Sequence, residues 1–255
     1  MKIHFDQTVF SKAEDWHGFQ RHHFQFEGYD AWIVEPRYPA GDGRWSWCMV
    51  WPESFVRRVG VISLLEHGFY HVHIDLFETR ANPEGVCTMS RFHDYLISLG
   101  LAEKTCLIGK SWGGFFSLRY ASEYPERIAS LYLDAPVCTA ADEGPSATTE
   151  MRRQEITSRF GLSFEELKTS PLNPLNRLEG IVKAGFPIFA LAGKEDTSVN
   201  LDSNLDTLEK KLTELGGKIR IIRRSFWGHH PHGLDDPEEI LAFHCDAVNG
   251  AEGTC

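Results

Sequence analysis

The segment around Ser111 has the residue types and the spacing of a catalytic nucleophile. Gly109, Ser111 and Gly113 form a G-x-S-x-G pattern. An apolar run that predicts a strand ends at Gly109, and a helical pattern begins just after Gly113. Small residues at the two flanking positions let the strand and the helix approach, and the sharp turn exposes the serine hydroxyl near a helix N-terminus. This setting favours a nucleophile over a serine that merely caps the helix.

The carboxylate that would accompany such a serine is predicted to be Asp196. It follows a predicted strand over residues 187–192 and lies between the serine and the last histidines, which gives the chain order Ser, Asp, His. Its role would be to hold the imidazole in one tautomer and to stabilise the imidazolium. Two other acids stay open. They are Glu195, its neighbour, and Asp134, which ends the strand predicted over residues 128–133.

The base is expected from a histidine-rich segment beyond the last predicted strand. His229 directly follows Gly228, and His230 and His232 come soon after it. An imidazole suits this role because its unperturbed pKa of about 6.5 lets it accept and return a proton near neutral pH. We predict His229 as the base, with His232 and His230 as alternatives.

The elements that must position these residues alternate between strand and helix. This alternation predicts an α/β protein, a three-layer α/β/α sandwich with a mainly parallel, twisted sheet. In such a sheet, functional side chains gather at the carboxyl ends of the strands. The predicted strands cover residues 24–35, 70–75, 105–109, 128–133, 187–192 and 218–224, and the predicted helices cover residues 54–67, 90–99, 115–124, 201–215 and 237–248.

Residues 137–185 interrupt this alternation. The segment is polar at first, carries a capping box at Ser163 and Glu166, and contains Pro171 and Pro174. We expect a small helical cap inserted into a single domain over residues 1–255. The cap is expected to roof the pocket.

Three motifs resemble those of the α/β-hydrolase superfamily. They are Gly109–Gly113 around the serine, Gly193–Asp196 around the acid and Gly228–His232 around the histidines. The resemblance spans nearly the whole chain. Within the superfamily, the sequence looks most like small single-domain esterases of the carbohydrate-esterase and dienelactone-hydrolase type. The resemblance implies the α/β-hydrolase fold, a triad of Ser111, Asp196 and His229, and no cofactor.

Acyl transfer also needs hydrogen-bond donors that point at the developing oxyanion. The backbone N–H of Trp112, the residue after the serine, is the first candidate. The second is expected from the loop over residues 37–52, where the lipase-type H-G-G-G is absent and the N–H of Ala40 is our candidate. The missing motif argues against a long-chain lipase.

Tryptophans gather in the segments predicted to border the site. We expect the tryptophans of these segments to form a wall that stacks on sugar or aromatic rings, namely Trp45, Trp47, Trp51, Trp112 and Trp227. Arg44 is expected to hold a carboxylate or a hydroxyl group of the substrate. For any single tryptophan, the alternative is a core anchor of the loop.

The composition limits the partners. The 255 residues include 26 basic and 36 acidic side chains, a net charge of −10. This charge argues against a nucleic-acid partner, because nucleic-acid binding depends on cationic groups.

No apolar run approaches the roughly 18 residues that a membrane span needs. If Met1 is the natural start, the polar N-terminus predicts a cytoplasmic protein without a signal peptide. The six cysteines are scattered, as is typical of reduced thiols.

We expect no metal ion. Three histidines within four positions suggest one, but a proline lies between them and no carboxylate or cysteine cluster accompanies them in the sequence.

The resulting hypothesis is a serine esterase that removes a small acyl group from a carbohydrate-like or aromatic alcohol, with a small-molecule ester as its partner. A peptidase or a carbon–carbon bond hydrolase on the same triad is one alternative. A ligand-binding protein with an idle triad is another. The sequence gives no indication of the oligomeric state.

Overall fold

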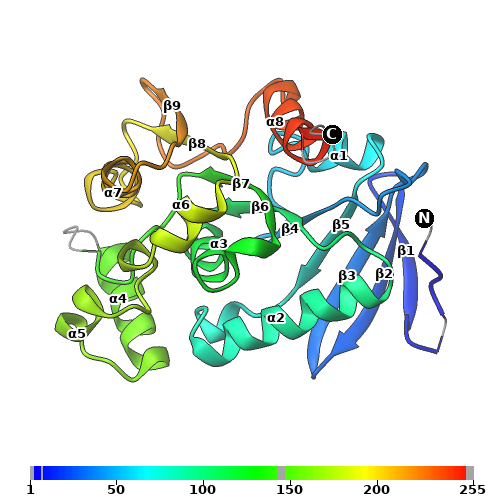
Figure 1. Ribbon diagram of the computed structural model, residues 1–255, viewed down its shortest axis with the longest axis horizontal. Coiled ribbons are helices and arrows are strands. Elements are labelled where there is room, and N and C mark those ends of the chain that lie inside the picture. Colours follow the sequence, from blue (N-terminus) through cyan, green and yellow to red (C-terminus); the bar gives the residue numbers. More distant parts are fainter. Residues whose placement is uncertain (1–2, 7, 143–146, 251–255) are drawn as a thin grey trace.

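The computed structural model describes residues 3–6, 8–142 and 147–250, and a nine-stranded sheet forms its centre (Figure 1). The strand order is β1-β2-β3-β5-β4-β6-β7-β8-β9. The pairs from β1 to β5 are antiparallel, and all pairs from β5 to β9 are parallel. The strands are β1 (Lys12–Trp16), β2 (Phe19–Phe26), β3 (Tyr29–Glu35), β4 (Trp45–Cys48), β5 (Tyr70–Ile74), β6 (Thr105–Lys110), β7 (Ile128–Asp134), β8 (Ile188–Gly193) and β9 (Arg220–Arg224).

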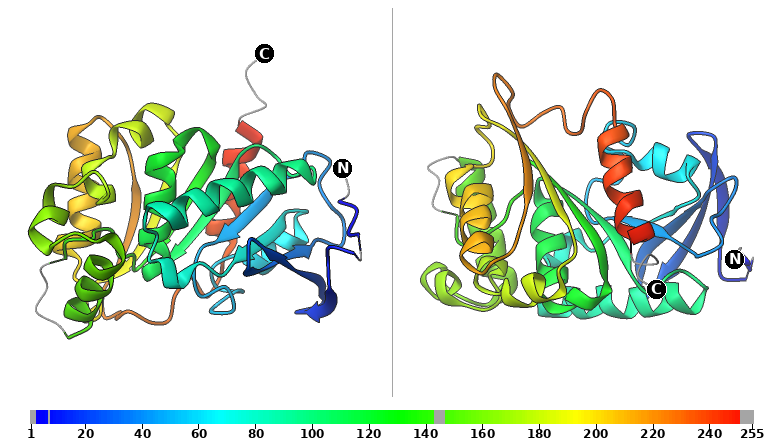
Figure 2. Two further views of the ribbon diagram at one scale, coloured as in Figure 1. Left: turned by 90° about the horizontal axis from the view of Figure 1, so that it is seen from below. Right: turned by 45° about the horizontal axis from the view of Figure 1, so that its top comes forward.

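Helices cover both faces of this sheet and complete the three layers that the sequence predicts (Figure 2). One face packs against α1 (Val61–Glu66) and α8 (Glu238–Asn249). The other face packs against α2 (Pro83–Ser98), α3 (Trp112–Glu123), α6 (Glu179–Ala184) and α7 (Thr207–Glu214). Short helical turns lie at Phe77–Thr79, Pro125–Arg127, Pro174–Asn176 and Asp202–Asp206. The predicted fold class is confirmed.

The segment between β7 and β8 carries α4 (Ala147–Phe160), α5 (Phe164–Thr169) and α6. The capping box predicted at Ser163 and Glu166 begins α5. Arg152 on α4 pairs with Asp142 at 3.0 Å and donates to the carbonyl of Ser198 at 2.9 Å. This segment therefore braces the loop that follows β8.

The parallel strands end along one edge of the sheet. β6, β7, β8 and β9 end at Lys110, Asp134, Gly193 and Arg224. Because these strands run in the same direction, the segments that leave them emerge at the same edge. The predicted nucleophile, the candidate acids and the histidine segment are thereby brought together.

The helix predicted over residues 54–67 is much shorter in the structure, where α1 covers only Val61–Glu66. The carbonyl of Ser54 accepts a hydrogen bond from the buried side chain of Lys110 instead of a helical N–H. Phe55 and Gly60 also have positive φ angles, of 57° and 79°, which an α-helix does not allow. Residues 54–60 are therefore a series of turns.

Two strands of the sheet, β4 and β1, are not predicted by the sequence pattern. β4 (Trp45–Cys48) lies within the predicted loop over residues 37–52, yet it pairs with β5 on one side and β6 on the other. Its four residues are all buried, so they show none of the polar–apolar alternation that marks a half-exposed strand. β1 adds a further antiparallel strand beside β2.

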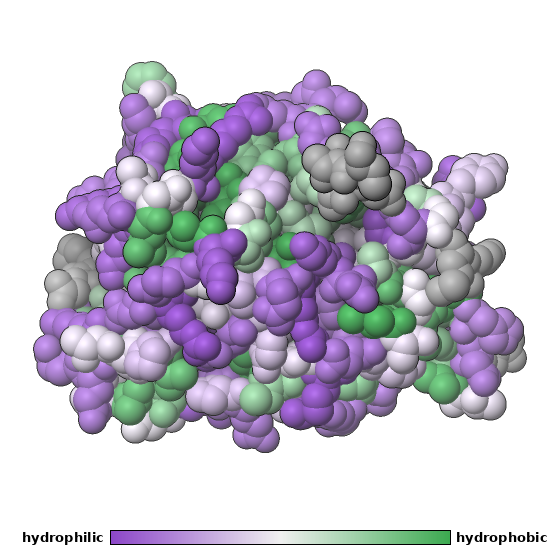
Figure 3. Space-filling view, in the orientation of Figure 1, coloured by the Kyte–Doolittle hydropathy of each residue, from purple (hydrophilic) through white to green (hydrophobic). Residues whose placement is uncertain are grey.

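The face seen in Figure 3 is mostly polar, and apolar side chains gather in a hollow between β9 and α8. Within the described ranges, none of the helices combines the length and the apolar character needed to cross a membrane. Met1, on which the expected location depends, lies outside these ranges.

Candidate active site

Ser111 lies at a sharp turn between β6 and α3. Its backbone has φ 48° and ψ −119°, a strained conformation for a residue with a side chain. A Cβ at Gly109 would lie 2.7 Å from Ser117 Oγ and 2.8 Å from the carbonyl oxygen of Gly113. The close approach of strand and helix therefore requires glycine at position 109, as the sequence pattern predicts.

Hydrogen bonds fix the backbone of Ser111 to the end of β7. Its N–H donates to the carbonyl of Asp134 at 2.9 Å. Its own carbonyl accepts from the N–H groups of Gly114 and Val137, each at 2.9 Å. The turn is thus held from both sides, and the serine side chain is left partly exposed at the edge of the sheet.

A continuous chain of hydrogen bonds joins Ser111, His229 and Asp196. Nε2 of His229 is 3.0 Å from Ser111 Oγ, and Nδ1 is 2.7 Å from Oδ2 of Asp196. A carboxylate accepts hydrogen bonds only, so Nδ1 carries the hydrogen and Nε2 is left to accept one from the serine. The three residues predicted as a triad therefore lie in the geometry that proton transfer from serine to histidine needs.

Asp196 is held in its ionised form. Burial raises the pKa of this carboxyl, but hydrogen bonds from His229 and from the backbone N–H groups of Val199 and Ser198 outweigh burial and lower the pKa below its ordinary value. The two N–H groups both reach Oδ1, at 2.9 and 2.8 Å. Oδ2 is thereby directed at His229.

The alternative acids have other surroundings. Glu195 is exposed. Asp134 is buried and accepts three hydrogen bonds, from Nδ1 of His232 at 2.6 Å, from the Tyr132 hydroxyl at 2.6 Å and from the N–H of Gly233 at 2.7 Å. Burial, and then the charge of Asp134, raises the pKa of Tyr132 well above its usual range. Asp134 therefore fixes the loop that carries the histidines rather than His229 itself.

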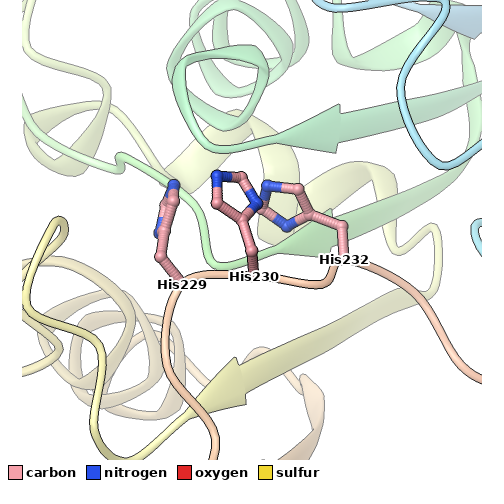
Figure 4. Close-up of side chains that lie close together, drawn as sticks. All are labelled: His229, His230 and His232. Atoms are coloured by element: carbon pink, nitrogen blue, oxygen red, sulfur yellow. The ribbon is translucent and has the colours of Figure 1, made fainter.

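The alternative bases also point elsewhere. His232 is buried and bonded to Asp134, whereas the exposed ring of His230 stacks on Phe55 with centroids 5.6 Å apart. Partial burial, followed by the neighbouring His232 and His229, lowers the pKa of His230. Figure 4 shows the three rings rising from the loop between β9 and α8. Of the three, His229 is the ring hydrogen-bonded to Ser111.

The prediction that Ala40 contributes to an oxyanion hole is wrong. Ala40 precedes β4, so it lies beyond the opposite end of this strand from Ser111. Its N–H already donates to the carbonyl of Gly68 at 3.0 Å. The error follows from the missed strand, since the segment that continues toward the serine begins only after Cys48. Trp112 does begin α3, with Ser111 in the preceding cap position.

Lys110 holds the segment after β4 in place. This side chain is fully buried, and its Nζ donates to the carbonyls of Trp51 at 3.0 Å and Ser54 at 2.8 Å. Trp51 has a positive φ of 57° and lies beside the serine in a cavity described below. The backbone of Val50 also lies close, since its nitrogen is 3.5 Å from where a Cβ of Gly113 would be.

The expected substrate wall is mostly core. Trp45 and Trp47 are 1% and 0% exposed on β4, and Arg44 pairs with Asp42 at 2.6 Å before this strand begins. The predictions that Trp45, Trp47 and Arg44 bind substrate are therefore wrong. The rings of Trp45 and Trp47 belong to β4 and pack in the core beneath α2, and Arg44 lies before this strand. Trp227 lies on the histidine loop, where its ring packs against Arg224 at 4.0 Å, but it is not among the residues that line the cavity at Ser111.

One cavity contains the serine, and a second cavity shares Trp51 with it. The first has a volume of about 330 Å³ and is lined by Trp51, Ser54, Phe55, Ser111, His229, His230 and His232. Among the described residues that line it, none comes from the insertion over residues 137–185. The second, about 530 Å³, is more polar, and its lining includes Arg21, His23, Trp32, Glu53, His73 and Asp75. Sequence reasoning missed Phe55 and the holding role of Lys110, because no local pattern reveals a left-handed backbone or a buried lysine.

The three histidines also form the one group of potential metal ligands found among the described residues. Their nearest nitrogens lie within 4.8 Å of one another.

Comparison with known families identifies the fold of this chain. Residues 11–162 match the sequence model of the family described as alpha/beta hydrolase fold. Because the match covers more than half of the chain, the chain belongs to the alpha/beta hydrolase fold family. The predicted family is confirmed. No curated protein matches the sequence closely enough to count as a relative.

Solved structures that share the fold include esterases and peptidases. An S-formylglutathione hydrolase from Agrobacterium tumefaciens has a TM-score of 0.62 at 13% identity, over 94% of this chain and 96% of that one. Carboxyl esterase 2 (TmelEST2) from Tuber melanosporum has a TM-score of 0.63 at 15% identity, over 92% and 87%. An acylaminoacyl peptidase from Pyrococcus horikoshii has a TM-score of 0.66 at 17% identity, over 83% and 38%.

The chain spans only 35% to 38% of the longer peptidase chains that it matches. At these identities, the likeness establishes the shared fold alone.

We predict that Gly109→Ala lowers the free energy of unfolding by about 1–3 kcal/mol, because the new methyl group would collide with the backbone of Gly113. Gly41→Ala is the matched control, since a Cβ there meets no atom within 4 Å. Its effect should stay within about 0.5 kcal/mol. Urea unfolding of the three proteins measures both values. Equal stability of Gly109→Ala and wild type would contradict the tight turn.

Proposed function

We propose that this protein is a serine hydrolase that cleaves a carboxylic ester through an acyl-enzyme on Ser111. The observation that carries the proposal is the unbroken hydrogen-bond chain from Ser111 Oγ through His229 to the ionised Asp196. A serine hydroxyl becomes a useful nucleophile only when a positioned base takes its proton. The family and its structural neighbours, which are esterases and peptidases of this fold, also support a hydrolase.

In the first half of the reaction, Ser111 Oγ bonds to the ester carbonyl carbon while its proton moves to Nε2 of His229. The carbonyl oxygen becomes an oxyanion, and we assign the backbone N–H groups of Trp112 and Trp51 as its donors. Trp112 is favoured by its position at the start of α3, where the helix dipole stabilises negative charge. Trp51 is favoured by its place in the same cavity as the serine.

Collapse of the tetrahedral intermediate breaks the carbon–oxygen bond to the alcohol, which takes the proton from His229. Water then enters, gives a proton to His229 and attacks the acyl carbon. Breakdown of the second intermediate returns that proton to Ser111 and releases the acid. Asp196 orients the imidazole and stabilises its charged form in both halves.

The two cavities suggest where the acyl group and the alcohol group of the ester bind. The smaller one, about 330 Å³, contains the serine and has Trp51 and Phe55 in its walls, which suits a small acyl group. The larger one, about 530 Å³, offers charged and imidazole side chains together with Trp32 and Phe77. Such a mixture can hydrogen-bond hydroxyl groups and stack on a ring. We therefore propose a polar, ring-containing alcohol as the leaving group.

We predict that a fluorophosphonate forms one covalent adduct with the wild-type protein and none with Ser111→Ala, because only an activated serine reacts. Intact-mass spectrometry measures both. An adduct that persists in Ser111→Ala would show that another residue is the nucleophile. The complete absence of labelling on a folded wild type would favour the ligand-binding protein with an idle triad. A parallel panel of acyl sugars, aryl esters and peptide anilides separates an esterase from a peptidase.

We predict different losses for the two buried aspartates. Asp196→Asn should lower kcat on p-nitrophenyl acetate by about 10⁴-fold, since the amide would stabilise the wrong imidazole tautomer. Asp134→Asn should instead lower the free energy of unfolding by about 2–4 kcal/mol, because the amide nitrogen cannot accept the buried hydrogen bonds that a carboxylate oxygen accepts, and should lower kcat far less. Steady-state kinetics and urea unfolding test this pair. The reverse ranking of the two kcat values would make Asp134 the acid.

A further inference from the structure

The histidine cluster has more nitrogen donors than proton transfer at one serine requires. His229, His230 and His232 stand side by side on one loop, with ring centroids 4.8, 5.1 and 4.8 Å apart (Figure 4). Each pair of rings is steeply inclined, at 71°, 77° and 85°. One nitrogen of each ring lies within 4.8 Å of the others. The cluster therefore forms a compact triangle of imidazoles.

This spacing fits an ion that takes nitrogen ligands in a tetrahedral shell. With Zn–N distances of about 2.0–2.1 Å, imidazole nitrogens around zinc lie about 3.3 Å apart and the ring centroids about 5 Å apart. The three centroids already have that separation. Coordination would require the nitrogens, which lie within 4.8 Å of one another, to approach to about 3.3 Å.

Two of the three rings are also held in the way that zinc ligands are held. Asp196 binds Nδ1 of His229 at 2.7 Å, and Asp134 binds Nδ1 of His232 at 2.6 Å. Each carboxylate fixes the ring and leaves Nε2 for another partner, which is the carboxylate–histidine arrangement seen around zinc. The carboxylates that seemed absent from the sequence are supplied by the ends of distant strands.

His230 supplies the third ligand from the solvent side. Its ring is exposed and rests on Phe55 at a tilt of 21°, so an arriving ion meets this residue first. Nitrogen ligands favour zinc over calcium or magnesium, which take oxygen.

We propose that His229, His230 and His232 form a zinc site that switches the hydrolase off. Zinc on Nε2 of His229 occupies the lone pair that would take the proton of Ser111, so the serine stays protonated and unreactive. Water or the serine hydroxyl would complete the four ligands. The inhibitory role rests on the proposed function, whereas the binding of zinc does not.

The test uses the full chain, freed of metal with a chelator, and three proteins: wild type, His230→Gln and His67→Gln. His67 is an exposed histidine at the end of α1, distant in sequence from the cluster, and serves as the matched control. Calorimetric titration with Zn²⁺ measures stoichiometry and affinity. Co²⁺ reports the ligand geometry through its visible absorption. Thermal unfolding confirms that each variant is folded.

The expected result is one zinc ion per chain for wild type and His67→Gln, a four-coordinate Co²⁺ spectrum, and affinity weakened by about tenfold or more in His230→Gln. Equal affinities for wild type and His230→Gln would overturn the site. So would wild type that binds no zinc.

The inhibitory role is tested by the ratio of p-nitrophenyl acetate turnover with and without saturating zinc, taken within each variant. The ratio should fall about tenfold or more in wild type and His67→Gln, and recover with chelator. Zinc that binds at the cluster without lowering turnover would overturn the switch. If wild type shows no turnover and no fluorophosphonate adduct, the proposed function fails, and the titrations still decide whether the site exists.

Discussion

Asp134 is the residue on which the rest of the site depends. Its backbone carbonyl accepts the N–H of Ser111, and its side chain holds His232 and Gly233 on the loop that carries His229. One residue at the end of β7 thus fixes the backbone of the nucleophile and the loop that carries the base relative to the sheet. Its carboxylate is buried, so this arrangement is stable only because three donors satisfy it.

A second constraint comes from Lys110, at the end of β6. Its buried side chain donates to two carbonyls of the segment after β4, and this segment contributes Trp51 to the lining of the serine cavity. A serine whose neighbours on both sides are fixed in this way needs little reorganisation during acyl transfer. The strained backbone conformation of Ser111 is offset by the backbone hydrogen bonds that its N–H and its carbonyl make on either side of the turn.

Much of this arrangement could be predicted from the sequence. The alternation of elements indicated the layered fold, and the strand–turn–helix pattern indicated Ser111, because both leave local signals. The order of Asp196 and His229 along the chain predicted residues that the structure brings together. The errors cluster around β4. Its four buried residues show no periodicity, so the sequence pattern places Ala40, Arg44, Trp45 and Trp47 in a loop at the site, whereas the structure places them in the core or at the far edge of the sheet.

Tertiary contacts that no local pattern records account for the rest. Asp134 and His232 are 98 residues apart in the chain, and Lys110 and Ser54 are 56 apart. The histidine cluster shows the same limit, since the sequence contains its nitrogen donors but not the carboxylates that orient them. Such pairs depend on which strands become neighbours.

The proposed mechanism requires Ser111 to carry an acyl group during turnover. This is tested by mixing the protein with p-nitrophenyl acetate, quenching with acid within the first turnovers, and measuring the intact mass and the modified peptide. We expect one added acetyl group on the peptide that contains Ser111, and none in Ser111→Ala. An acetyl group on another residue, or hydrolysis at the wild-type rate by Ser111→Ala, would contradict it.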